Sequence, residues 1–173
     1  MKQSPYNAMD VANYIVQYYA KESTPINNLL LMMILYYLQV HYLVHNKKLF
    51  NEPIEMWGHG PVIHEVYDYF EENRTLPIEK TVTYIECTND SKWIIVKPND
   101  RKLSKSDEIT IINISKPIVN KYRNDPYRLL KIVQNEHMWK KNKTRITSGE
   151  LHIKYDESEI KQYFSNSKNK FTN

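Results

Sequence analysis

The feature that most constrains the fold is an uninterrupted apolar run of ten residues, 29–38. It is much shorter than the ~20 apolar residues that a membrane-spanning helix needs, and polar residues flank it on both sides. The threonine-proline pair at 24–25 supplies the N-cap and first-turn proline of a helix start. The sequence therefore predicts a helix up to about Val44 that is apolar nearly all round. Such a helix must be covered on most sides, so we expect it at the centre of the fold and expect no membrane partner.

Length and composition indicate one globular domain. The chain has 173 residues, of which 41% are hydrophobic and 25% are charged, as in an ordinary domain with a core. We place the domain at residues 1–165 and a frayed basic C-terminal tail at 166–173. The single cysteine, Cys87, excludes an internal disulfide, and we expect no export signal at the start of the chain. These features predict a cytoplasmic protein.

Helical spacing and start signals predict five or six helices. Besides the central helix, they cover about 4–21, 61–73, 104–119, 125–138 and 156–164. Two β-prone runs with a polar segment between them predict one hairpin at 81–97, and residues 140–149 are interpreted as a polar loop. The expected fold class is α+β and predominantly helical, with a compact bundle of about five or six helices around a central apolar helix and one small β-hairpin.

The excess of positive charge lies near the end of the chain. The 24 basic and 20 acidic residues give a net charge of +4. Residues 1–138 hold 16 of each sign, whereas residues 139–173 hold eight basic and four acidic residues. Nucleic-acid-binding domains carry a denser basic stripe, so we interpret this excess as a solvated face. No segment of the sequence resembles a helix-turn-helix, so we expect no sequence-specific nucleic-acid binding.

The sequence offers little for catalysis or metal binding. His41 and His45 are one helical turn apart, but a zinc site needs a third protein ligand. Cys87 has no CxxC partner, and the three glycines of the chain form no nucleotide-binding loop. We therefore expect no enzyme, no metal and no cofactor. The alternative in this class is a small hydrolase or transferase that uses His59, His64, Glu65 or His137.

Tyrosine is abundant, with 14 residues in the chain. Tyrosine side chains supply buried area in cores and anchors in protein interfaces. Several lie on the first two predicted helices at spacings that cannot all point inward, among them Tyr14, Tyr18, Tyr36, Tyr37 and Tyr42. Some of them should line a groove or a partner surface, which favours a binding protein over an enzyme.

Two segments resemble a known family. Residues 26–39 read INNLLLMMILYYLQ, and residues 50–67 read FNEPIEMWGHGPVIHEVY. Their order and spacing are similar to the tyrosine-rich "KLLYYAQ" helix, the "PIEAW" segment, the "GPV" turn and the "VY" pair of the Panacea family. This is the SocA-like antitoxin domain, also met as the phage-associated GepA proteins. The block from Trp57 to Tyr67 is the specific part, and fainter resemblance at 104–107 and 135–139 extends it over nearly the whole chain.

Several polar positions of that family differ in this chain. Leu30 and Met33 stand where the family carries lysines on this helix, and Val133 and Gln134 stand at its threonine-histidine pair. If those polar groups perform the function of the family, this chain keeps the fold with another partner, because function belongs to sites rather than folds.

The resemblance implies an antitoxin that neutralises a toxin encoded beside it. It would act by direct binding, or as an adaptor that delivers the toxin to a Clp-type protease. The predicted partner-binding residues are Tyr36, Tyr37, Trp57, His59, Gly60, Pro61, Tyr67 and Trp139. Two alternatives remain open: Trp57, Pro61 and Trp139 pack together as core with the interface elsewhere, or the chain is a phage-derived inhibitor of a host enzyme.

Overall fold

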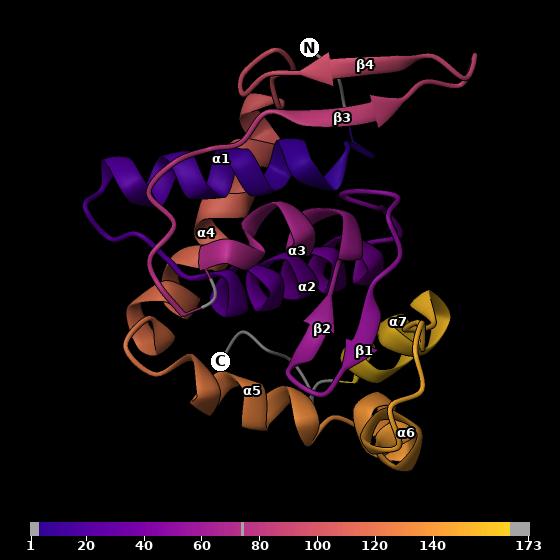
Figure 1. Ribbon diagram of the computed structural model, residues 1–173. Helices are drawn as coiled ribbons and strands as arrows, with labels where there is room; N and C mark the ends of the chain where they lie inside the picture. Colours follow the sequence, from indigo (N-terminus) through magenta and orange to yellow (C-terminus); the bar gives the residue numbers. More distant parts are fainter. Residues whose placement is uncertain (1–3, 74, 167–173) are drawn as a thin grey trace.

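The computed structural model describes residues 4–73 and 75–166. These residues form seven α-helices and one short 3-10 helix (Figure 1). In chain order they are α1 (Ala8–Lys21), α2 (Asn28–Val44), α3 (His64–Phe70), η1 (Glu71–Asn73), α4 (Lys105–Tyr122), α5 (Pro126–Gln134), α6 (His137–Thr147) and α7 (Glu157–Ser165).

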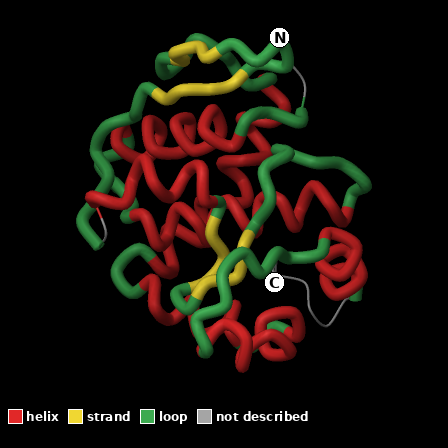
Figure 2. Tube along the Cα trace, turned by 45° about the vertical axis from the view of Figure 1, so that its right-hand side comes forward, coloured by secondary structure: helices red, strands yellow, loops and turns green. Residues whose placement is uncertain are grey.

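Two small antiparallel sheets complete the described part of the chain. The first pairs β1 (Glu55–Trp57) with β2 (Gly60–Val62), and the second pairs β3 (Tyr84–Cys87) with β4 (Trp93–Val96). The β3–β4 hairpin confirms the prediction at 81–97. The β1–β2 hairpin comes from a segment whose prolines and glycines gave no alternating strand pattern, and it forms because the turn at residues 58–59 folds it back on itself. Figure 2 shows the β3–β4 hairpin at the upper end of the helical body and the β1–β2 hairpin lower down.

Helix α2 is the centre of the fold. All its residues are buried except Leu29, His41 and Val44, which are partly exposed. It contacts α1, α3, α4, α5, α7 and β2. A helix that is apolar on every face is stable in water only when its neighbours cover those faces. The prediction of a central apolar helix is confirmed.

Side-chain caps determine where the helices begin. Ser104 and Asp156 cap α4 and α7 as predicted, each accepting the backbone N–H three residues later. The caps of α1 and α2 are Asn7 and Asn27, three residues after the predicted start signals. Asparagine caps a helix as well as serine or threonine does, and the Oδ1 atom of Asn27 accepts the Leu30 N–H at 2.9 Å.

Most of residues 140–149 belong to α6, so the prediction of a polar loop there was wrong. Only Met138, Trp139, Asn142 and Ile146 of this helix are buried, and Ile146 is the one apolar residue at 140–147, so the sequence shows no apolar helical pattern there. Contacts with α5, α7 and β1 stabilise the helix instead. The break between α5 and α6 raises the number of helices among the described residues to seven.

The fold class is α+β and predominantly helical, as expected. The buried apolar side chains form one continuous core that includes α1, α2, both hairpins and α4 to α7. Within the described residues, no helix combines the length and the apolar character needed to cross a bilayer. Residues 167–173 of the predicted tail lie outside the described residues.

Candidate functional site

The turn between β1 and β2 requires a glycine. Gly60 has a φ of +113°, a backbone conformation that side chains with a Cβ rarely adopt. A Cβ atom on Gly60 would also lie 3.1 Å from Leu130 Cδ1 of α5. Pro61 follows in β2 and is buried. This hairpin can therefore approach α5 closely and hold one fixed shape.

Helices α5 and α6 each donate a side-chain hydrogen bond to the backbone of the β1–β2 hairpin at its turn. The Nε2 atom of Gln134 donates to the Gly58 carbonyl at 3.0 Å, and the indole Nε1 of Trp139 donates to the Trp57 carbonyl at 3.4 Å. Trp139 is 5% exposed, so its ring packs in the core beneath the hairpin. Two hydrogen bonds from two helices thus fix the backbone on which the Trp57 side chain is carried.

Aromatic rings gather around Trp57 and form a surface with contributions from three segments. The centre of the Trp57 ring lies 5.5 Å from that of His59, 5.8 Å from that of His64 and 5.2 Å from that of Tyr67. His152, from the segment before α7, lies 6.4 Å from His64. Trp57, His59 and Tyr67 are partly exposed, and the two other histidines are exposed. We call these five residues the Trp57 surface.

A buried carboxylate orients two members of the Trp57 surface. Glu55 is 5% exposed; its Oε2 accepts the Trp57 Nε1 proton at 2.9 Å, and its Oε1 lies 3.0 Å from His152 Nδ1. Burial alone raises the pKa of Glu55, but the hydrogen bonds from Trp57 and His152 outweigh it and hold the pKa below its usual value. Glu55 is therefore ionised near neutral pH and fixes the rotamer of the indole ring.

His59 is neutral near physiological pH. Burial lowers its pKa, and its Nε2 atom is buried without a hydrogen-bond partner among the described residues. Its ring lies 5.5 Å from that of Tyr67, so it extends the aromatic face. An unsatisfied buried nitrogen costs free energy.

Tyr36 and Tyr37 lie in the core instead of on the Trp57 surface. They are 0% and 2% exposed, and their hydroxyls donate to the Glu136 carboxylate at 2.6 Å and 2.8 Å. Glu136 is itself 4% exposed, and burial raises its pKa from 4.5 to about 7 although the two hydrogen bonds oppose this rise. Tyr155 packs 5.1 Å from the Tyr36 ring, with its buried hydroxyl unpartnered among the described residues. A partner could contact these rings only if the core opened.

The structure brings together the part of the predicted site that is contiguous in sequence. Trp57, His59 and Tyr67 face one region, with Gly60 and Pro61 shaping the turn and Trp139 supporting it. Sequence reasoning missed Glu55 and His152, which are 97 residues apart. Glu136 was also missed, although it lies within the segment that resembles the family. No sequence signal links Glu55 to His152.

Two of the histidines that could serve an enzyme, His59 and His64, lie against the Trp57 ring, whereas His137 contacts α7. His137 lies 3.8 Å from Glu159 of α7, whereas His64 lies 3.5 Å from Asp68 on its own helix. Glu65 is exposed on α3. Within residues 4–73 and 75–166, no three histidine, cysteine or acidic residues are placed to hold a metal ion. The arrangement of the Trp57 surface suits contact with a protein, since flat, rigid rings give large contact area at low entropic cost.

One comparison with known proteins gives a match. The family described as "Antitoxin SocA-like, Panacea domain" matches residues 31–140, which is more than half of the chain. The matched region contains α2 from residue 31, both hairpins, Trp139, and Glu136 with its two hydrogen-bond donors Tyr36 and Tyr37. His152 and α7 lie outside it. No curated protein and no solved structure matches the chain.

Proposed function

Because the chain belongs to the family of SocA-like antitoxins with a Panacea domain, we propose that it neutralises a toxin encoded beside it by binding that toxin directly through the Trp57 surface. The family assigns an antitoxin role in general. The proposal adds the mode of action and the residues that perform it.

The observation that carries this proposal is the rigidity of a partly exposed aromatic group. Trp57 is fixed through its backbone by Trp139 and through its side chain by Glu55. Residues that dominate protein interfaces are enriched in tryptophan and tyrosine, and rings held in place before binding lose little entropy on association. The Trp57 surface has both properties.

The test begins with the genes on either side. Each neighbouring open reading frame is expressed alone and together with this chain, and growth and co-purification are measured. We expect one neighbour to be toxic alone and harmless in a stoichiometric complex. A toxic neighbour that is rescued without a stable complex, and only while a Clp-type protease is present, would replace direct binding by the adaptor route. If no neighbour is toxic, the proposal is refuted.

A pair of tyrosine variants then tests the surface. Tyr67→Ala removes a ring of the Trp57 surface, and we expect toxin binding to weaken about 30-fold, since truncation of an interface anchor costs about 2 kcal/mol. Tyr127→Ala is the matched control, because Tyr127 is 53% exposed at the end of α5 opposite Gln134. Equal affinities of the two variants, with both folded by circular dichroism, would place the interface elsewhere and favour a structural role for the motif.

A further inference from the structure

Helices α4 to α6 carry an excess of positive charge that ion pairs neutralise only in part. Residues 109–149 include nine lysines and arginines but only two acidic residues, one of which is the buried Glu136. Lys141 pairs with Glu159, and Arg145 pairs with Glu150. The other seven basic side chains are exposed, and none has an acidic group within ion-pair distance in the described part of the chain.

Helix α5 presents some of these charges together with an aromatic ring. Leu130 and Val133 are buried, and the helical period places Tyr127, Arg128 and Lys131 on the opposite side. Tyr127 is 53% exposed, and both basic residues are exposed. Lys131 lies one turn after Tyr127 and Arg128, at the spacings where helical side chains are neighbours. One exposed ring is therefore flanked by two cations.

A tight turn between α4 and α5 adds a third cation. The Asp125 N–H donates to the Tyr122 carbonyl at 3.0 Å, and the Arg128 N–H donates to the Asp125 carbonyl at 3.2 Å. Arg123 is exposed within this turn, at the N-terminal end of α5. Asp125 is also exposed, but within the described residues its carboxylate pairs with neither arginine. We call four residues the α5 basic face: Arg123, Tyr127, Arg128 and Lys131.

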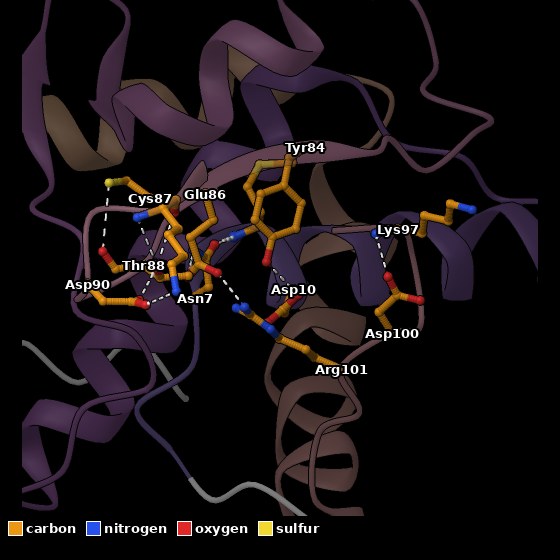
Figure 3. A network of polar contacts seen from close by, with 12 residues as sticks. Asn7, Asp10, Tyr84, Glu86, Cys87, Thr88, Asp90, Lys97, Asp100 and Arg101 are labelled. Carbon is orange, nitrogen blue, oxygen red and sulfur yellow. Dashed lines mark hydrogen bonds and ion pairs between the residues drawn. The ribbon is translucent and has the colours of Figure 1, made fainter. Parts of the chain in front are cut away.

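Ion pairs neutralise several basic side chains elsewhere in the fold. Figure 3 shows Arg101 directed at the Glu86 carboxylate of β3, with which it forms an ion pair. Lys92 likewise pairs with Asp90 at 2.9 Å. The cations of the α5 basic face have no such partner among the described residues, so they can contact an anionic ligand without giving up an ion pair.

Negative charge is concentrated in another segment. Residues 49–73, which include β1, β2, α3 and η1, contain six acidic residues and no lysine or arginine. A polyanion is therefore repelled by the segment that carries Trp57 and attracted to α4–α6. Figure 1 shows α5 at the lower edge of the body, with α2 between it and α1. The inference below does not depend on toxin binding by the Trp57 surface.

We propose that the α5 basic face binds single-stranded nucleic acid without sequence specificity. Its three cations would contact phosphates, and the Tyr127 ring would stack on a base. A single strand offers both negative charges and unstacked bases, whereas an acidic protein surface uses only the charges and a duplex keeps its bases in the stack. No base edge is read in these contacts, which agrees with the expectation of no sequence-specific binding.

Fluorescence anisotropy with labelled strands of about 12 nucleotides tests the proposal on the full chain. The probes are oligothymidylate, oligouridylate and a strand of equal length without bases. Three phosphate contacts predict a slope of about −2 for log affinity against log salt, which is about a 15-fold loss between 50 and 200 mM salt. We expect the base-free strand to bind about tenfold more weakly than oligothymidylate, because it cannot stack on Tyr127.

Two double variants locate the phosphate contacts. Arg128→Gln with Lys131→Gln should weaken oligothymidylate binding about tenfold and make the salt slope shallower by about 1.4. Lys80→Gln with Lys97→Gln is the matched control, because it removes the same charge from exposed lysines outside α4–α6 that have no acidic partner among the described residues. The affinity of the control should stay within about twofold of the unchanged chain.

Two variants of Tyr127 test the stacking contact. Tyr127→Phe keeps the ring and should bind within about twofold of the unchanged chain. Tyr127→Ala should bind oligothymidylate about tenfold more weakly with the same salt slope, and should no longer distinguish it from the base-free strand. Circular dichroism reports that each variant is folded.

Each contrary result overturns a stated part of the proposal. No binding of oligothymidylate at about 100 μM protein in 50 mM salt would show that these charges are only solvated. Equal affinities for oligothymidylate, the base-free strand and polyglutamate would make the face a docking surface for acidic proteins instead. Equal losses in the two double variants would place the contacts elsewhere. Oligothymidylate and oligouridylate should bind within about threefold of each other, since no contact reads the 2′-hydroxyl; a preference above about tenfold would identify DNA or RNA as the ligand and refute recognition by phosphate and base alone.

Discussion

Replacing Glu136 by glutamine should remove a pH dependence of stability that this single carboxyl creates. Burial raises the pKa of Glu136 from 4.5 to about 7, against the hydrogen bonds from Tyr36 and Tyr37. Between these two pH values the folded chain holds a proton that the unfolded chain has released. The free energy of unfolding therefore falls as pH rises through this window and becomes level above it.

The size of the effect follows from the change in pKa. A rise from 4.5 to about 7 corresponds to about 3 kcal/mol, at about 1.4 kcal/mol per pH unit. Glutamine has the shape of the protonated acid and does not titrate; its carbonyl oxygen can accept from one tyrosine hydroxyl and its amide N–H can donate to the other. Between about pH 5 and pH 8 the unchanged chain should therefore lose about 2.5 kcal/mol more stability than Glu136→Gln does.

Urea unfolding followed by circular dichroism, at several pH values across this window, measures the difference. Other titrating groups contribute equally to both proteins and cancel when the two pH profiles are subtracted. Glu72→Gln is the matched control, because Glu72 is exposed on η1 and its replacement should leave the profile unchanged. Parallel profiles for the unchanged chain and Glu136→Gln would show that the carboxylate is already ionised at pH 5, and would refute the reasoning.

Two further predictions concern stability. Gly60→Ala should lower the free energy of unfolding by about 1–3 kcal/mol, because the φ of +113° strains any residue with a Cβ and the new atom would crowd Leu130. The control Gly58→Ala, with no atom within 4 Å of its Cβ position, should change the free energy of unfolding by less than about 1 kcal/mol. Equal losses of stability in thermal unfolding would contradict this prediction. Tyr19→Phe should cost about 1–2 kcal/mol, because the buried Tyr19 hydroxyl lies 2.7 Å from Ser115 Oγ, and the double variant with Ser115→Ala should recover part of the loss. Additive losses would mean that the two hydroxyls stabilise the fold independently.

The helical elements were predictable where their signals are local. The apolar run of α2 and the caps Ser104 and Asp156 lie within a few residues of the structure they determine. Helix α6 was missed because most of its side chains are charged or polar and its stability comes from contacts with α5 and α7. Intrinsic propensity is a weak guide when tertiary packing supplies most of the stability of a helix.

The candidate site was likewise predictable only where its residues are close together in the sequence. The block from Trp57 to Tyr67 is contiguous, so a tight turn followed by a helix brings its rings together. The contact between Glu55 and His152 depends on the segment before α7, which runs beside β1. There the backbones of Glu55 and Lys154 form an antiparallel β-bridge. A pairing over that distance leaves no local signal in a single sequence.

The sequence by itself determined the central helix, the fold class, the β3–β4 hairpin and the turn that follows Trp57, because short-range periodicity and glycine placement govern them. Only the tertiary structure decided which tyrosines are buried. Tyr36 and Tyr37 are in the core because Glu136, 100 and 99 residues away, accepts their hydroxyl protons there. Tyr14 and Tyr18 are partly exposed on α1. A buried hydroxyl needs a partner, and which residue becomes that partner depends on how distant segments pack.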